Sequence, residues 1–599
     1  MPLASLGGPV LPRSRGVVRW ASVLVWASTM PAWSQTTFNQ IALTGELAPG
    51  AADGAEFDAF TGFPVINASG DVAFAADLRT GSSGIEVTFI NDEAIFGPVS
   101  GAGSPLGIVA RDDALAPGVS DGAEFSNFGS FAINASGDVA FAAFLRTGPG
   151  GSAVTFDNNQ AIFGPVSGAG SSLGVIARTN DLAPGVADGS EFSFVGAPAL
   201  NAAGDVAFSA NLRAGPGGTA VTGGNNGAVF GPVSGVGSSL GVIARTDSLA
   251  PGVSDGAEFD SFASVPTLNT AGDAAFFARL RRGPSGAAVT SVNDSAIFGP
   301  VSGAGSPLGV IARENDLAPG VTDNAEFAGL GAPSLNASGD VAFTATLRTG
   351  PGGTAVGSTN NSVVFGPVSG AGSSLGVIAR EDALAPGVSD GAEFNFFGLP
   401  AINAAGDVAF AAFLRTGSQG AAVTVDNDNA IFALINGELD LILREGDLFD
   451  VTSNDLSEQR TIGSIGPIRL GPNSFSDSGM LVFELGFTDG SEGIFTAAIS
   501  GPGPASPLGD YNGDGFVGQT DLDLVLLNFG DTVLPTGFGT DGLGGAFDNL
   551  ISQNELDLVL TNFGSSGLAR AVAVPEPAGL ALLGLGGLSL AWRRARRVS

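Results

Sequence analysis

Residues 510–521, DYNGDGFVGQTD, have the types and spacing of a calcium-binding loop. Asp510, Asn512 and Asp514 stand at alternate positions and are followed by a glycine that permits a sharp turn. The next ligands at this spacing are the backbone carbonyl of Phe516 and the carboxylate of Asp521, and water would fill the ninth position, a glycine. A hard cation takes about 6–8 oxygen ligands, which this spacing can bring together. We therefore predict a Ca2+ site here, with a chance acidic loop as the alternative.

A second copy of this segment has lost part of the pattern. Residues 548–564, DNLISQNELDLVLTNFG, align with residues 514–530, DGFVGQTDLDLVLLNFG. Asp548, Ser552 and Glu555 keep oxygen ligands, but Gly544 and Ala546 replace the first two. An asparagine also replaces the turn glycine. We expect one good Ca2+ site and a second that is weak or absent.

Each loop is followed by an expected helix. Leu522, Val525, Leu526 and Phe529 recur at helical spacing, and the same apolar stripe returns in the second copy. The duplicated loop and helix over 510–564 resemble a type I dockerin. That resemblance implies Ca2+ binding and a cohesin module as partner. A Ca2+-stabilised spacer that binds no partner is the alternative.

The residue types that are missing exclude several chemistries. The chain contains no Cys, no His and no Lys. Disulfides, imidazole bases, Schiff-base lysines and lysine-containing phosphate loops are therefore excluded. The formal net charge of −34 disfavours nucleic acid and anionic lipid as partners and favours cations.

The other carboxylates recur in an internal repeat. Asp121 and Glu124 have copies with nearly the same neighbours in most units. A catalytic pair is normally unique, so we predict that the chain is not an enzyme. Weak sugar or Ca2+ contacts and glycosidase chemistry remain alternative interpretations of these positions.

The two ends of the chain carry targeting patterns. Residues 1–34 contain arginines, a short apolar run and small residues, which is typical of a secretory signal peptide. Residues 575–599 begin with Pro575, Glu576 and Pro577, continue as an apolar stretch and end in an arginine cluster. The arginines are Arg593, Arg594, Arg596 and Arg597.

This C-terminal pattern resembles the PEP-CTERM sorting signal of Gram-negative bacteria. The resemblance implies a short transmembrane helix, transient anchoring in the inner membrane and recognition by an exosortase-type peptidase. It also implies export to the outer surface or the extracellular matrix. The arginine cluster is expected to stay cytoplasmic, and a plain membrane anchor is the alternative interpretation.

The body of the chain is a tandem repeat. Its landmark glycines are separated by 67, 67, 68, 67 and 67 residues, and a seventh, weaker copy ends the series. They are Gly70, Gly137, Gly204, Gly272, Gly339, Gly406 and Gly479. Each unit contains about four short apolar segments separated by turns, the content of one propeller blade. The repeats also resemble the tandem NxxGxxAF family, which implies architecture and export but no established activity.

The phase of the repeat indicates how the ends meet. The segment that starts near residue 38 supplies the part that the last unit lacks. Sharing one blade between the two ends would close a ring and remove open sheet edges. We therefore predict a mainly β fold, a seven-bladed β-propeller over 35–500, with a β-solenoid as the alternative.

The stretch INASGDVAF at 66–74 has three interpretations: a glycosylation sequon, a ligand loop, or a turn that leads into a strand. LNAAGDVAF lacks the serine, and FSDSGMLVF lacks both the asparagine and the aspartate. Both keep the glycine and the apolar alternation, which favours the turn. In DVAFAADLR, Val72, Phe74, Ala76 and Leu78 are expected on one face of the strand, with small alanines on the other.

These observations define the expected organisation. A signal peptide (1–34) precedes the propeller (35–500), a linker (501–509), the calcium module (510–564), a second linker (565–574) and the sorting tail (575–599). The predicted function is a structural or adhesion role at the bacterial surface or matrix. The alternative is a component of extracellular polysaccharide breakdown, either carbohydrate-binding or glycoside-hydrolysing, that is recruited through the dockerin.

Overall fold

The structure is a computed structural model, and it describes residues 37–499 with short gaps. The gaps are 82–85, 150, 152–153, 217–220, 284–288, 354–355, 418–422, 453–457, 467–470 and 472. The chain divides into two units, Gln35–Gly501 and a second made of Met1–Ser34 and Pro502–Ser599. In the second unit only Leu522, Val525 and Leu526 are described, each in α-helical conformation. The described residues include no helix long and apolar enough to cross a membrane.

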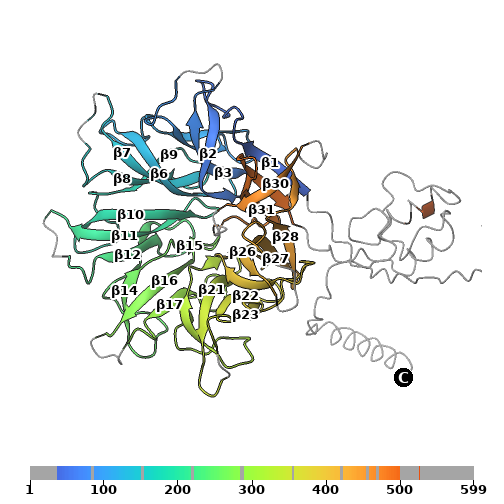
Figure 1. The fold of residues 1–599 in the computed structure, drawn as a ribbon. Coiled ribbons are helices and arrows are strands. Elements are labelled where there is room, and N and C mark those ends of the chain that lie inside the picture. The colour runs from blue at the N-terminus through green and yellow to red at the C-terminus, as the bar shows by residue number, and fades with distance from the viewer. Residues whose placement is uncertain are drawn as a thin grey trace, which may run out of the picture. The chain divides into compact units, whose positions relative to one another are not determined.

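The first unit is a ring of seven antiparallel sheets, which we call blades 1–7 (Figure 1). Blade 1 contains β2 (Glu56–Ile66), β3 (Val72–Arg79), β4 (Glu93–Pro98) and β5 (Leu106–Arg111). Blade 2 contains β6 (Glu124–Ile133), β7 (Val139–Arg146), β8 (Gln160–Pro165) and β9 (Leu173–Arg178). Blade 3 contains β10 (Ser190–Leu200), β11 (Val206–Ala214), β12 (Gly227–Pro232) and β13 (Leu240–Arg245).

In blades 4–6 the innermost strand is split into two pieces. Blade 4 contains β14 (Glu258–Phe262), β15 (Thr267–Leu268), β16 (Ala274–Arg281), β17 (Ser295–Pro300) and β18 (Leu308–Arg313). Blade 5 contains β19 (Glu326–Leu330), β20 (Ser334–Leu335), β21 (Val341–Arg348), β22 (Ser362–Pro367) and β23 (Leu375–Arg380). Blade 6 contains β24 (Glu393–Phe397), β25 (Ala401–Ile402), β26 (Val408–Arg415), β27 (Asn429–Ile435) and β28 (Glu438–Arg444).

Blade 7 is built from both ends of the repeat region. It contains β29 (Leu448–Asp450), β30 (Gln459–Ile465), β31 (Met480–Phe487), β32 (Glu492–Ala498) and β1 (Thr37–Leu43). β1 pairs with β32 in antiparallel register, from Thr37 opposite Ala498 to Leu43 opposite Gly493. In Figure 1 the blue β1 lies against the orange strands of this blade. The predicted seven-bladed ring, closed by a shared blade, is confirmed.

The second strand of each blade is buried on both faces, as the alternation in DVAFAADLR predicts. Phe74 and its strand neighbours on the same face pack towards blade 7, while Ala73 and Ala75 pack against blade 2. Small alanines on the second face let the next blade approach closely. In blade 1 three phenylalanine rings pack together: Phe74 and Phe96 are stacked with centroids 5.4 Å apart, and Phe57 meets Phe96 edge to face at 5.0 Å.

The INASGDVAF motif joins neighbouring blades. The buried Asn67 accepts hydrogen bonds at Oδ1 from the backbone N–H of Ser69 (3.0 Å) and Asp71 (2.9 Å). Its Nδ2 donates to the backbone carbonyl of Asn134 in blade 2 at 3.0 Å. Gly137, in the next copy, has φ +80°, and a Cβ there would lie 2.5 Å from the backbone nitrogen of Ala102 in blade 1. The motif is therefore a turn, as predicted, and it also holds adjacent blades together.

The repeated carboxylates are held in ion pairs. Arg178, at the end of β9, places Nη1 2.8 Å from Asp121 Oδ2. Glu124 lies beside Arg146, with its Oε2 3.6 Å from Arg146 Nε. Equivalent Arg–Asp pairs at 2.7–2.8 Å recur in blades 1–6. These positions therefore have a structural role within blades 1–6.

Candidate binding site on the propeller axis

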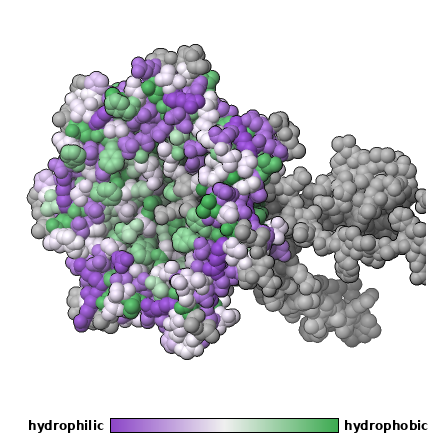
Figure 2. All heavy atoms as spheres, in the orientation of Figure 1, coloured by the Kyte–Doolittle hydropathy of each residue, from purple (hydrophilic) through white to green (hydrophobic). Residues whose placement is uncertain are grey.

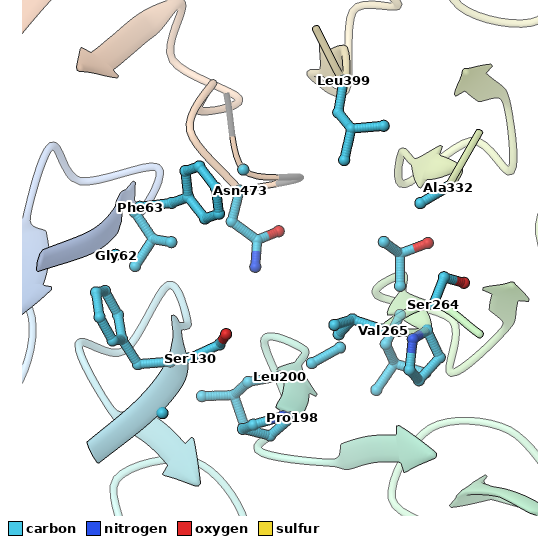
Figure 3. A pocket seen from close by; sticks show the side chains of 18 of the residues that line it. Gly62, Phe63, Ser130, Pro198, Leu200, Ser264, Val265, Ala332, Leu399 and Asn473 are labelled. Atoms are coloured by element: carbon cyan, nitrogen blue, oxygen red, sulfur yellow. The ribbon is translucent and has the colours of Figure 1, made fainter. Parts of the chain in front are cut away.

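A cavity of about 530 Å3 lies where the innermost strands of the seven blades converge. Each blade contributes residues to its wall, among them Phe63, Ser130, Leu200, Ser264, Ala332, Leu399 and Asn473. Figure 3 shows these side chains surrounding an open centre. Figure 2 shows hydrophobic residues gathered around the centre of the disc and hydrophilic residues towards its rim.

The innermost strands shape this wall because one of their edges is not paired within the sheet. Pro198, Pro266, Pro333 and Pro400 all line the cavity. Proline lacks a backbone N–H, so it is tolerated in a strand mainly at a free edge. Pro266, Pro333 and Pro400 lie between the two pieces of the inner strand in blades 4–6, whereas Pro198 lies within β10, and all four contribute apolar surface to the wall.

The apolar wall also contains a few polar groups. Thr61, Ser130 and Asn473 line it together with one carboxyl group, Glu93. The Thr61 Oγ1 atom is buried and has no hydrogen-bond partner among the described residues. Apolar walls with a small number of polar groups are typical of sites for small or extended ligands. Thr61 Oγ1 is therefore an unsatisfied polar atom next to the cavity.

Glu93 is the acidic group of the wall. Its Oε2 accepts hydrogen bonds from Asn127 Nδ2 (2.9 Å) and from the backbone N–H of Phe128 (3.2 Å). Burial raises the pKa of Glu93 to about 7, and the carboxylate of Asp112 adds to this effect against the Phe128 hydrogen bond. The pKa of Asp112 is itself raised to about 6, mainly by burial. Glu93 thus changes its charge near neutral pH.

The equivalent position is acidic in blade 7, where it is Glu492, but not in blades 2–6. In blades 2–6 it is occupied by Gln160, Gly227, Ser295, Ser362 and Asn429. Among the described lining residues Glu93 is the one carboxyl group, whereas glycoside hydrolysis generally uses two. Within the same described ranges, no group of three or more acidic residues is arranged to hold a metal ion.

The sites predicted from the sequence lie outside the described residues. This applies to the calcium ligands Asp510, Asn512, Asp514, Phe516 and Asp521, and to Asp548, Ser552 and Glu555. It applies equally to the sorting-motif residues from Pro575 to Arg597. Leu522, Val525 and Leu526, which belong to the predicted apolar stripe, are helical, and Val525 is buried.

The axial cavity was not predicted. The sequence nevertheless contained a signal. In each unit a short segment separates the Glu-Phe pair from the turn that resembles Asn-Ala-Ser-Gly-Asp, and this segment varies more between units than the residues on either side of it. These segments read DAFTGFPVI, SNFGSFAI, SFVGAPAL, DSFASVPTL, AGLGAPSL and NFFGLPAI. Variable positions in an otherwise uniform repeat are those that packing between neighbouring blades does not constrain, so they are candidates for lining a cavity.

Comparisons with known proteins extend this picture. The fold is a seven-bladed β-propeller with a cavity on its axis. The chain belongs to the family of unknown function DUF7453, which matches residues 16–359 and 352–507. Residues 573–597 match the PEP-CTERM protein-sorting motif, which marks an exported protein whose tail is processed by an exosortase. No curated protein matches the sequence.

Solved structures show only remote similarity. A Trypanosoma rangeli sialidase is 12% identical, with 84% of this chain and 64% of that chain covered and a TM-score of 0.28. A subtype N11 neuraminidase-like protein of A/flat-faced bat/Peru/033/2010 (H18N11) is 9% identical, with coverages of 66% and 96% and a TM-score of 0.26. This chain spans less than two thirds of the sialidase's length. At these TM-scores the similarity supports no inference about activity.

Proposed function

We propose that this protein is a binding and scaffolding component of the bacterial cell surface or extracellular matrix, and that it is not an enzyme. The observation that carries the proposal is the axial cavity of a propeller whose chain ends in an export and sorting signal. The cavity wall offers apolar surface, prolines and isolated polar groups. Such a wall suits recognition of a surface component, because binding needs shape and a few hydrogen bonds.

Substitution inside the cavity tests this role. Ala332→Trp places a large ring in the wall, and Ala102→Trp adds the same ring to an exposed loop. Each full-length variant is mixed with envelope and matrix material from producing cells, and the fraction retained after washing is measured. We expect retention to fall with Ala332→Trp and to remain with Ala102→Trp. Equal retention of the two variants would refute binding through the cavity.

The calcium module is a second part of the proposal. It rests on the residue pattern of 510–521 and on the resemblance to dockerins. We propose that this loop binds one Ca2+ and that the module either docks a cohesin or acts as a stabilised spacer. Titration calorimetry of the full chain should show one strong Ca2+ site that Asp514→Ala removes. Unchanged Ca2+ binding in that variant would reject the assignment.

The alternative function is a role in extracellular polysaccharide breakdown. Glu93, whose pKa of about 7 would suit a general acid, is the observation that favours it. An activity screen on polysaccharides separates the two proposals. Turnover abolished by Glu93→Gln would favour the alternative, and no turnover by the wild-type chain would favour binding alone.

A further inference from the structure

Two phenylalanines project from turns of blades 1 and 2 into solvent. Phe89 lies between β3 and β4 and is 86% exposed, and Phe156 lies between β7 and β8 and is 96% exposed. Of the large apolar side chains in the described part of the chain, these two are the most exposed. Each exposed ring offers a large, flat apolar surface to a ligand.

The turns that carry these rings are held by hydrogen bonds. In blade 1 the Thr88 backbone N–H donates to Asn91 Oδ1 at 2.8 Å, and the Asn91 N–H donates to the Thr88 carbonyl at 2.9 Å. In blade 2 the Thr155 N–H donates to Asn158 Oδ1 at 2.7 Å, and the Asn158 N–H donates to the Thr155 carbonyl at 3.1 Å. The backbone below each ring is therefore fixed before any ligand arrives.

The equivalent turns of the other blades are closed in the same way but have different tips. The Thr222 N–H donates to Asn225 Oδ1 at 2.7 Å in blade 3, and similar bonds occur in blades 4–6. The tip residues there are Gly223, Ser291, Ser358 and Val425. An aromatic tip is thus a property of two adjacent blades and is not needed to form the turn.

Polar groups lie beside each ring. Asp157, next to Phe156, has its exposed carboxylate 2.8 Å from Arg213 Nη1 of blade 3. Arg146 of blade 2 donates through Nη2 to the carbonyl of Ile90, next to Phe89, and lies 2.6 Å from Asp113 Oδ1. Each aromatic tip is therefore flanked by a carboxylate and a guanidinium that can share hydrogen bonds with a ligand.

We propose that the two phenylalanine-tipped turns are a binding platform for an uncharged extracellular polysaccharide. A pyranose ring has an apolar C–H face that packs on an aromatic ring, and hydroxyl groups at its edge that bond to carboxylates and guanidinium groups. Equivalent rings on adjacent blades suit a polymer that offers the same sugar repeatedly. The net charge of −34 opposes binding of an anionic polymer. This inference rests on the proposed surface-binding function and names a ligand class for it.

Affinity electrophoresis of the full-length chain tests the platform. The gels contain hydroxyethyl cellulose, mixed-linkage β-glucan or dextran as uncharged probes, and alginate as an anionic one. At least one uncharged polymer should retard the wild-type chain, and alginate should not. Phe89→Ala and Phe156→Ala should each weaken that binding roughly fivefold, which corresponds to about 1 kcal/mol.

Two further variants sharpen the test. Val425→Ala truncates an equally placed apolar tip that is 81% exposed, and it should leave binding unchanged. Gly223→Phe should strengthen binding, because it adds a third ring next to blade 2. A Cβ at Gly223 meets no atom within 4 Å, and its φ lies outside the left-handed region, so the substitution fits the turn.

Several outcomes would overturn the proposal. They are the absence of retardation in all three uncharged gels, retardation that both Phe→Ala variants retain, and stronger retardation by alginate. Phenylalanine-dependent binding to phosphatidylcholine vesicles without polysaccharide binding would identify a membrane contact and reject it as well. If Ala332→Trp abolishes matrix retention while the phenylalanine variants change nothing, the cavity function stands and the platform does not.

Discussion

Replacing left-handed glycines by alanine should destabilise the propeller to different degrees, depending on what each glycine faces. Gly137 has φ +80°, and a Cβ on it would lie 2.5 Å from the Ala102 nitrogen and 2.6 Å from the Gly101 carbonyl carbon. These atoms belong to the backbone of the neighbouring blade, which cannot move aside as a side chain can. Gly103 has a similar φ of +73° but meets nothing within 4 Å.

The magnitudes follow from adding the two effects. A left-handed conformation costs a non-glycine residue roughly 1–2 kcal/mol. Overpacking against fixed neighbours adds about 1–3 kcal/mol. We therefore expect Gly103→Ala to lower the free energy of unfolding by about 1–2 kcal/mol and Gly137→Ala by about 2–5 kcal/mol. Gly70→Ala should fall between them, because its Cβ would meet the flexible Met480 sulfur at 3.2 Å.

Urea unfolding of the full chain, followed by far-ultraviolet circular dichroism, measures these differences. Tryptophan fluorescence is unsuitable because Trp20, Trp26, Trp33 and Trp592 all lie outside the propeller. If Gly137→Ala and Gly103→Ala shift the urea midpoint equally, the contact between blades is not tight. The proposed role of the motif in joining the blades would then be wrong.

Three further predictions concern other parts of the propeller. Burial raises the pKa of Glu93 from its ordinary 4.5 to about 7, so the folded state binds this proton more tightly than the unfolded state does. The stabilisation that protonated Glu93 gives the folded state is therefore complete below pH 4.5 and is lost as the pH rises to about 7. Glu93→Gln, which copies Gln160 of blade 2, should flatten this dependence in urea unfolding at pH 5 and pH 8, and an unchanged slope would contradict the assignment. Arg178→Met leaves the half-buried Asp121 without its partner and should cost about 2–4 kcal/mol in the same assay. A loss below about 0.5 kcal/mol, which is typical of an exposed pair, would show that the pair is unimportant. Deleting residues 37–43 leaves β32 with an open edge and should produce aggregates in gel filtration, so a monodisperse monomer would argue against closure by β1.

The repeat made the fold predictable, because each unit contains its own strand and turn signals. The alternation in Val72–Leu78 and the complementary ends of the repeat were sufficient to place the faces and to close the ring. The hydrogen bond from Asn67 to blade 2 was not predicted, because a local turn pattern does not show which distant carbonyl lies beside it.

The candidate site was harder to predict than the fold. The wall of the axial cavity combines seven segments that are far apart in sequence, and no single one of them resembles a binding motif. Residues such as Thr61 and Glu93 acquire their properties from burial, which depends on how the blades come together. In the sequence, the phenylalanines at the turn tips were likewise only two apolar residues between predicted strands. They become candidates for binding because their side chains are exposed to solvent, and the sequence alone does not show which side chains are exposed.

The shared blade has a consequence for the order of folding. Blades 1–6 each join strands that are close in sequence, so each of them can begin to form as soon as it has been synthesised. β1 emerges first, yet its partner β32 emerges only after all six of these blades. Until then the earliest strand stays without a partner, and the growing ring remains open and prone to aggregation. The ring can therefore close only after the whole repeat region has been synthesised, and a chain that ends early keeps an unpaired strand edge.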